Sequence, residues 1–150
     1  MSQHYASSQS MGYKNRIEKV AIVGAGGNVG KHITNGLLQT GKHTVTAITR
    51  ADSKSTLPSG VSAVNVDYAD QSSLVKALKG HDALVITMSV FAQPDSEIKL
   101  IDAASTAGVS WVMLNSYSTD IEHKDMQRDM RLGPGYDKVL QHINSKPELS

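Results

Sequence analysis

Short apolar segments alternate with amphipathic segments from Lys19 onward, and this alternation predicts successive β-strand and α-helix units. The fully apolar run at residues 20–23 suits a strand that is buried on both faces, as in a parallel sheet. By the same pattern, we expect four further strands, at residues 44–49, 61–66, 83–87 and 110–114.

Helical spacing of apolar residues predicts helices between these strands. The first covers residues 29–40, the second runs from an Asp70 N-cap to Gly80, and the third runs from Pro94 and Asp95 to Gly108. A last helix is predicted at residues 136–143, whereas residues 120–131 are charged and only weakly periodic. Right-handed crossovers then predict a Rossmann-like, doubly wound α/β fold with strand order 3-2-1-4-5 and helices on both faces.

Composition limits the classes of protein to consider. Residues 1–16 show no apolar periodicity and predict a disordered leader, which leaves residues 17–150 as one domain. The net charge of +1 does not favour nucleic acid as a partner, and no apolar run is long enough to cross a membrane. The absence of cysteine fits a reducing compartment such as the cytoplasm, and the six histidines form no metal-ligand pattern.

A glycine-rich segment lies between the first predicted strand and the first predicted helix. A phosphate approaches such a turn only where side chains are absent and free backbone N–H groups point at it. The spacing is G-x-x-G-x-x-G, and this context predicts a dinucleotide site; the alternative is a tight turn without a ligand. The residues assigned to the cofactor are Gly24, Ala25, Gly26, Gly27, Asn28, Val29 and Gly30.

The end of the second strand carries Thr49 and Arg50, where an NAD-selective protein usually has a carboxylate. Arg50 can bind a 2′-phosphate, and Lys54 is near enough in sequence to add a second cation, so we predict NADP as the cofactor. The alternative is that both are solvated surface charges. Asp67 and Tyr68 are predicted to flank the adenine, although a helix-capping turn also explains Asp67.

Three further residues complete the predicted cofactor site, because ligands of open α/β sheets bind at the carboxyl ends of the strands. They follow the fourth and fifth strands and are Thr87, Met88 and Asn115. For Asn115, a polar turn is the simpler alternative.

Several segments together resemble the NmrA-like, isoflavone-reductase-like branch of the atypical short-chain dehydrogenases/reductases: residues 20–30, 49–50, 66–68, 82–86 and 107–112. The resemblance implies an NADP-binding Rossmann lobe that acts on a small organic carbonyl or enone. Full-length members complete the substrate pocket with a C-terminal lobe. Because this sequence ends after the fifth strand and one helix, we expect that lobe to be absent.

The resemblance also implies a catalytic lysine near the start of the helix that follows the fifth strand. Lys138 is the nearest candidate, and Tyr136 is an alternative for the same turn, but the two do not form a Tyr-x-x-x-Lys pair. A lysine beside the nicotinamide can relay a proton while NADPH delivers hydride. The alternative for Lys138 is an exposed helix lysine.

Two functions follow as hypotheses: an NADP-dependent oxidoreductase, or a non-catalytic dinucleotide-sensing regulator or protein-binding module of the same family. The predicted fifth strand, Ser110 to Leu114, lies at the edge of the sheet. An open edge of this kind favours a second copy or a protein partner.

Overall fold

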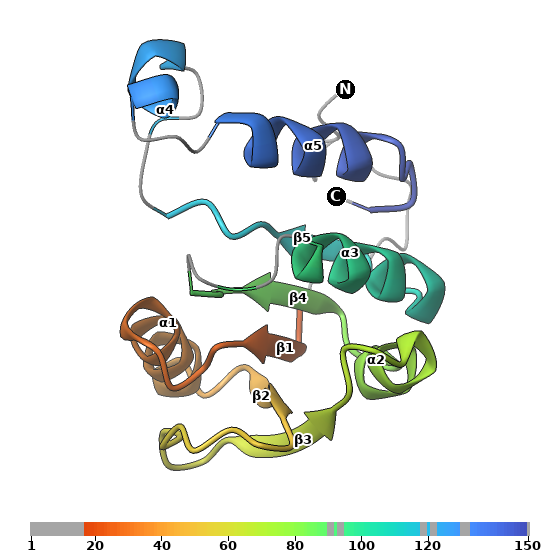
Figure 1. The fold of residues 1–150 in the computed structure, drawn as a ribbon. Helices are drawn as coiled ribbons and strands as arrows, with labels where there is room; N and C mark the ends of the chain where they lie inside the picture. The colour runs from red at the N-terminus through yellow and green to blue at the C-terminus, as the bar shows by residue number, and fades with distance from the viewer. Residues whose placement is uncertain are drawn as a thin grey trace, which may run out of the picture.

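The structure is a computed structural model that describes residues 17–89, 92, 95–117, 120, 123–129 and 133–149. The predicted leader and Pro94 lie outside these residues. Five parallel strands form one sheet in the order β3-β2-β1-β4-β5, which confirms the predicted Rossmann-like fold (Figure 1). The strands are β1 (Lys19–Val23), β2 (Thr44–Arg50), β3 (Ser62–Val66), β4 (Ala83–Ile86) and β5 (Trp111–Met113).

The helices agree with the sequence pattern except near the C-terminus. They are α1 (Asn28–Gln39), α2 (Gln71–Leu78), α3 (Ser96–Ala107), α4 (Lys124–Asp129) and α5 (Gly133–Asn144). The weakly periodic charged segment contains α4, and α5 begins three residues before the predicted start at Tyr136. Pro134 is compatible with this earlier start, because a residue in the first turn of a helix does not need its own N–H for an intrahelical bond.

Local chemistry explains where two of the helices begin and end. The carboxylate of Asp70, the N-cap of α2, accepts a hydrogen bond from the Ser72 backbone N–H at 2.9 Å. Gly108 ends α3 with φ 77°, a left-handed conformation that favours glycine, and the following Val109 N–H donates to Ala104 O at 3.0 Å. Both residues act as the sequence predicted.

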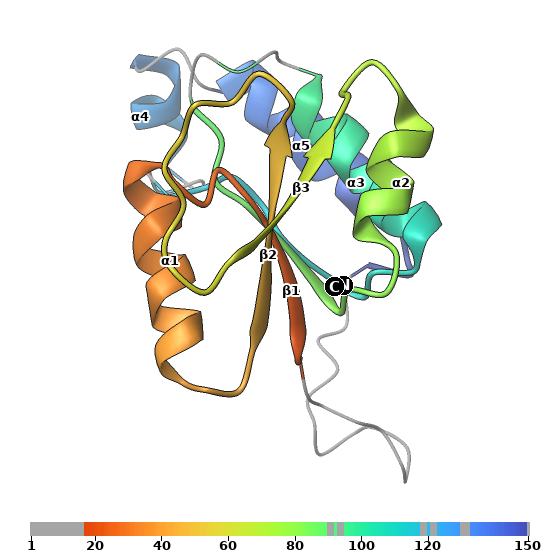
Figure 2. The same cartoon turned by 90° about the horizontal axis from the view of Figure 1, so that it is seen from below.

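Helices cover both faces of the sheet. Figure 2 shows α1 on one face and α2, α3 and α5 on the other. Alternate residues of β1 divide between them: Val20 and Ile22 pack on the α1 side, and Ala21 and Val23 pack on the opposite side. In the part of the chain that the structure describes, no helix is long and apolar enough to cross a membrane.

Strand β5 forms one edge of the sheet, and its three residues differ in exposure. Val112 is 9% exposed and joins the core with α3, whereas the flanking Trp111 and Met113 are 39% and 54% exposed. Self-association through this edge stays a prediction, which sedimentation of the purified chain would test.

Candidate functional site

The glycine-rich segment forms a tight turn between β1 and α1. Gly24 has φ 78°, in the left-handed region, and its carbonyl accepts a hydrogen bond from the Gly27 N–H at 2.9 Å. Gly27 is the N-cap of α1, and its carbonyl accepts the Lys31 N–H at 3.0 Å, so the helix begins directly at the turn.

Close packing explains why Gly24 and Gly30 are glycines. A Cβ on Gly24 would lie 2.0 Å from the Thr87 carbonyl oxygen, and a Cβ on Gly30 would lie 2.0 Å from the Gly24 carbonyl oxygen. The buried Thr87 hydroxyl donates to Val23 O at 2.6 Å and joins the end of β4 to the end of β1. Thr87, which we predicted as a cofactor contact, thus packs directly against the glycine turn and holds it in place.

The N-terminus of α1 fits a phosphate group. The Gly27 cap makes no side-chain hydrogen bond, and the first helical turn, all of it described, contains no acidic residue. Asn28 and Val29 are exposed there, whereas Ala25, within the turn, is buried. Free first-turn N–H groups and the positive end of the helix dipole are the features with which helices bind phosphates.

The end of β2 presents charge to solvent. The Arg50 side chain is 68% exposed, and its Nε lies 3.4 Å from a carboxylate oxygen of Asp52. Such an exposed pair contributes little stability, so the guanidinium is free to bind a ligand instead. Lys54 is also exposed, in the loop that follows, while the Thr49 hydroxyl donates to the Asn65 side chain at 2.8 Å.

Asp67 and Tyr68 follow β3 at the same end of the sheet. The Asp67 carboxylate accepts the Ala69 N–H at 2.8 Å and so closes a turn before α2, whose N-cap is Asp70 rather than Asp67. Burial raises the pKa of Tyr68 to about 12, although the nearby Arg50 charge opposes this change. The phenol is therefore neutral at physiological pH and offers a flat surface beside Arg50.

A polar cluster joins the carboxyl ends of β4 and β5. The Asn115 side chain accepts the Met88 N–H at 3.1 Å and donates to Met88 O at 3.2 Å. The Asn115 N–H donates to the Glu97 carboxylate at 2.8 Å. The predicted contacts Met88 and Asn115 therefore lie together, at the edge where open α/β sheets bind ligands.

Glu97 belongs to this cluster and was missed from the sequence. Burial raises the pKa of its carboxyl, and the hydrogen bond from Asn115 opposes that change. Burial and the Glu97 charge also raise the pKa of the exposed Tyr117. The one available signal was an acidic residue in the first turn of a predicted helix, a position that is common on surfaces.

The two predicted catalytic residues lie on α5. The Lys138 ammonium is 3.0 Å from a carboxylate oxygen of Asp95, and its side chain is 64% exposed. This hydrogen bond lowers the pKa of Asp95. Tyr136 is partly buried on the same helix. The pair of charges therefore connects α5 to the start of α3, and Lys138 has a structural partner in this arrangement.

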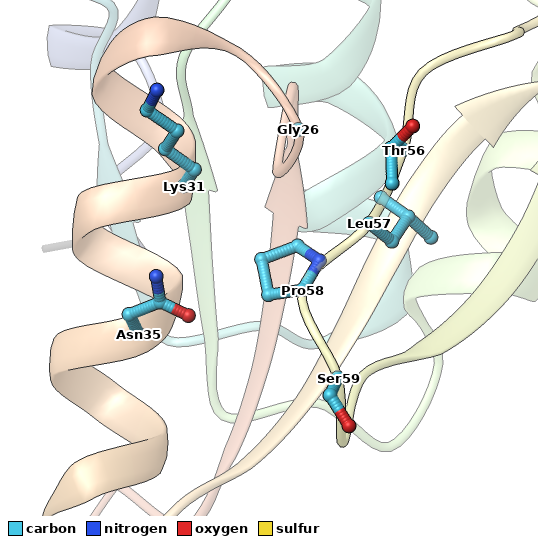
Figure 3. Close-up of a pocket in the computed structure, with 7 residues that line it drawn as sticks. All are labelled: Gly26, Lys31, Asn35, Thr56, Leu57, Pro58 and Ser59. Atoms are coloured by element: carbon cyan, nitrogen blue, oxygen red, sulfur yellow. The ribbon is translucent and has the colours of Figure 1, made fainter.

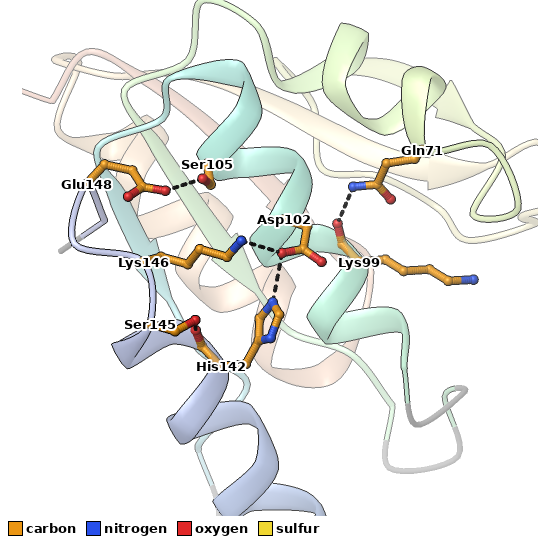
Figure 4. Close-up of polar contacts among 8 residues, drawn as sticks. All are labelled: Gln71, Lys99, Asp102, Ser105, His142, Ser145, Lys146 and Glu148. Atoms are coloured by element: carbon orange, nitrogen blue, oxygen red, sulfur yellow. Dashed lines mark hydrogen bonds and ion pairs between the residues drawn. The ribbon is translucent and has the colours of Figure 1, made fainter.

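A second polar cluster connects α5 and the following segment to α3 (Figure 4). Asp102 on α3 lies 2.8 Å from His142 Nε2 and 2.9 Å from Lys146 Nζ, and Ser105 donates a hydrogen bond to Glu148. Burial opposes the Asp102 charge, but the hydrogen bonds from Lys146 and His142 outweigh it and lower its pKa. This cluster holds α5 in place.

A shallow groove lies beside the glycine turn, between α1 and the loop that joins β2 to β3 (Figure 3). Its volume is about 400 Å³, and it opens to solvent. The residues that line it are Gly26, Lys31, Asn35, Thr56, Leu57, Pro58 and Ser59. A search of the described residues for groups of three or more metal-ligating side chains found none.

A parallel five-stranded sheet with a glycine turn between β1 and α1 defines a dinucleotide-binding Rossmann fold. The family model for NAD(P)H-binding proteins matches residues 24–144, and the chain therefore belongs to this family.

Known proteins extend the comparison. Oxidoreductase aprR of Aspergillus flavus is 40% identical over 103 residues, 68% of this chain and 34% of its own length. The structure of AtPrR2 with NADP+ and (+)pinoresinol matches this chain with a TM-score of 0.74 and 19% identity. The match covers 89% of this chain and 48% of the AtPrR2 chain. A crystal structure of isoflavone reductase matches with a TM-score of 0.66 and 21% identity, over 83% of this chain and 46% of the reductase chain.

These comparisons confirm the resemblance stated from the sequence. The fold is shared with reductases of the isoflavone-reductase type, and the family is one that binds NAD(P)H. The chain spans about a third of the length of the curated relatives it matches.

Proposed function

We propose that the chain is the cofactor-binding part of an NADP(H)-dependent oxidoreductase of the isoflavone-reductase-like type, acting on a carbonyl or enone of a small organic molecule. The observation that carries this proposal is the uncapped N-terminus of α1 directly after the glycine turn. The name of aprR and the NADP+ bound to AtPrR2 support it. Arg50 and Lys54 at the end of β2 favour NADP over NAD.

In this proposal, each group of residues has a separate task. The N–H groups of Asn28, Val29 and Gly30 donate to the pyrophosphate, and Arg50 and Lys54 bind the 2′-phosphate. Tyr68 flanks the adenine. Met88 and Asn115 border the nicotinamide half, at the carboxyl ends of β4 and β5.

When bound, NADPH would supply the hydride for reduction of an electrophilic carbon of the substrate. Reduction also needs a proton on the substrate oxygen or on the carbon next to it, and Lys138 or Tyr136 is the donor that we propose. For this task, the Lys138 ammonium must leave Asp95, to which it lies within 3.0 Å. Exchange of one exposed partner for another costs little, because such ion pairs contribute at most about 1 kcal/mol.

The same ion pair favours a second candidate function, in which the chain binds NADP without turnover and acts as a dinucleotide-sensing or protein-binding module. Lys138 and Asp95 are both largely exposed and bound to each other, so Lys138 has a role in the fold that needs no substrate. Binding alone would then be the complete activity of this chain.

Fluorescence titration of the purified chain with NADPH and with NADH tests the binding step. We expect tight NADPH binding that Arg50→Ala weakens by about 10-fold or more, with NADH binding unchanged. Lys76→Ala, on the distant helix α2, is the matched control for loss of a surface cation. Failure of the wild-type chain to bind either dinucleotide would exclude both candidate functions.

Oxidation of NADPH, followed by absorbance with a panel of small quinones, enones and aldehydes, separates the two candidates. Turnover that is lost in Lys138→Met but retained in Asp95→Asn supports the enzyme and assigns the proton to Lys138. Binding without turnover on the whole panel supports the module.

A further inference from the structure

The groove beside the glycine turn extends the proposed cofactor site away from the nicotinamide half. Gly26, the third residue of the glycine motif, lies at one end of it, and Pro58 and Ser59 lie at the other (Figure 3). The loop comes very close to the turn, because a Cβ on Gly26 would lie 2.7 Å from the Thr56 carbonyl oxygen. The groove therefore begins directly at the glycine turn, where the proposed function places the pyrophosphate.

Lys31 is the cation that lines this groove. It lies four residues after Gly27 and therefore on the same side of α1, and helical side chains lean toward the N-terminus of their helix. Figure 3 shows the Lys31 side chain extended toward that end, with Asn35 one turn further along the helix. The Lys31 ammonium makes no ion pair with any residue that the structure describes, and the side chain is exposed.

The Asp52 carboxylate near Arg50 affects how strongly this end of the site attracts a 2′-phosphate. The Arg50 guanidinium has Asp52 as its neighbour at 3.4 Å, so the two together carry no net charge. A 2′-phosphate carries close to two negative charges at pH 7, and it must overcome the repulsion of the Asp52 carboxylate. Because this exposed pair is weak, the phosphate can displace Asp52 from Arg50, and cations without an acidic partner add to the attraction. Among the described residues, Lys54 on the loop and Lys31 on α1 are such cations.

We infer that Lys31, at the groove between α1 and residues 56–59, binds the adenosine 2′-phosphate and sets the preference for NADP over NAD. The inference rests on the proposed function, since it needs a dinucleotide at the glycine turn. It adds a helix residue to a recognition step that the sequence assigned to Arg50 and Lys54 alone. Leu57 and Pro58, on the loop between β2 and β3, line the groove opposite α1.

The test compares Lys31→Met with the wild-type chain by calorimetric titration of NADPH, NADH and 2′,5′-ADP. Methionine keeps the length and the helix propensity of lysine and removes only the charge. We expect Lys31→Met to weaken NADPH and 2′,5′-ADP by about 10-fold and to leave NADH unchanged. Lys31→Arg keeps the positive charge and should retain most of the preference for NADPH over NADH. Lys42→Met, in the turn after α1, is the control for a lost surface charge.

The outcomes separate this inference from the function on which it rests. Equal weakening of NADPH and NADH would overturn it and place Lys31 at the pyrophosphate. Unchanged NADPH binding would also overturn it and leave the proposed function intact. No binding of any dinucleotide by the wild-type chain would overturn both. Thermal unfolding of each variant shows whether a loss of affinity is a loss of fold.

Discussion

The two faces of the sheet differ in how they are built. The face with α2, α3 and α5 buries the larger cluster, in which Leu84, Leu100 and Ile101 are completely inaccessible to solvent. The α1 face has a smaller cluster around Ile22 and Val45, closed by partly buried leucines of the helix. The glycine turn and Lys31 belong to α1 or its start, and the groove lies between α1 and the β2–β3 loop on this face.

This difference separates stability from binding. In the proposed function, α1 presents N–H groups of its first turn and the Lys31 side chain to the cofactor, so this side of the helix stays open and gains less from apolar burial. The opposite face has no such requirement and packs three helices together. We therefore expect substitutions on the two faces to have different effects, and the predictions below test that expectation in order of decreasing effect.

The largest loss is expected for Gly30→Ala in the glycine turn. The new Cβ would lie 2.0 Å from the Gly24 carbonyl oxygen and 2.6 Å from the Thr87 hydroxyl oxygen, so the turn or β4 must move. We expect a loss of about 4 kcal/mol in the free energy of unfolding, together with loss of dinucleotide binding. Urea denaturation and NADPH titration measure the two effects.

Gly36→Ala, in the same helix, is the matched control. A Cβ there would meet no atom within 4 Å, so alanine should stabilise α1 by about 0.5–1 kcal/mol through its better helix propensity. Similar losses in both variants would mean that close packing is not the reason for glycine in the turn.

The second prediction compares leucines of the two faces. Leu100→Ala, at a fully buried position on α3, should cost about 3 kcal/mol, because it removes packed atoms and leaves a cavity. Leu37→Ala, at a partly buried position on α1, should cost about 1 kcal/mol. Chemical denaturation of both variants tests this difference, and equal costs would contradict the division between the faces.

The third prediction concerns the polar cluster between β4 and β5. Glu97→Leu leaves the Asn115 N–H, a donor at 2.8 Å in the wild type, without its acceptor and should cost about 2 kcal/mol. Glu97→Gln keeps an acceptor oxygen without the charge and should cost far less. If both variants are equally stable, the hydrogen bond does not hold the Asn115 turn.

The same pair of variants gives a pH dependence. Because burial raises the pKa of Glu97 above its ordinary value of 4.5, the folded chain holds this proton more tightly than the unfolded chain. The contribution of Glu97 to stability therefore falls as the pH rises from about 4.5 through the raised pKa, and Glu97→Gln lacks this contribution. The difference between their unfolding free energies should change over that interval and stay constant above it.

The fold was predictable because each local signal agrees with the architecture. Alternating apolar runs predicted all five strands, and Asp70 and Gly108 predicted two helix ends. The short α4 escaped prediction, because a charged segment of 6 residues has too few turns to show a helical period.

The candidate site was only partly predictable, since motif spacing reports backbone shape better than side-chain partners. The glycine turn was predicted in full. The Asp52 partner of Arg50, the support that Thr87 gives the turn, and the Asn115 contact of Glu97 depend on distances between elements. Lys31 needed the position of the β2–β3 loop, which places Leu57 and Pro58 across the groove from it. The hydrophobic pattern of a single segment cannot predict such distances between elements.

The smallest effects are expected on β5, where two adjacent residues test the difference between the two faces of the sheet. Val112 points into the larger core and Met113, the next residue, points to the opposite face, because successive strand residues alternate. Val112→Ala should cost about 1.5 kcal/mol, and Met113→Ala less than about 0.5 kcal/mol. Thermal denaturation of both variants at several protein concentrations is the measurement. A large cost at Met113 that grows with protein concentration would show that a second copy covers this edge, and Met113 would then belong to an interface between copies rather than to an exposed surface.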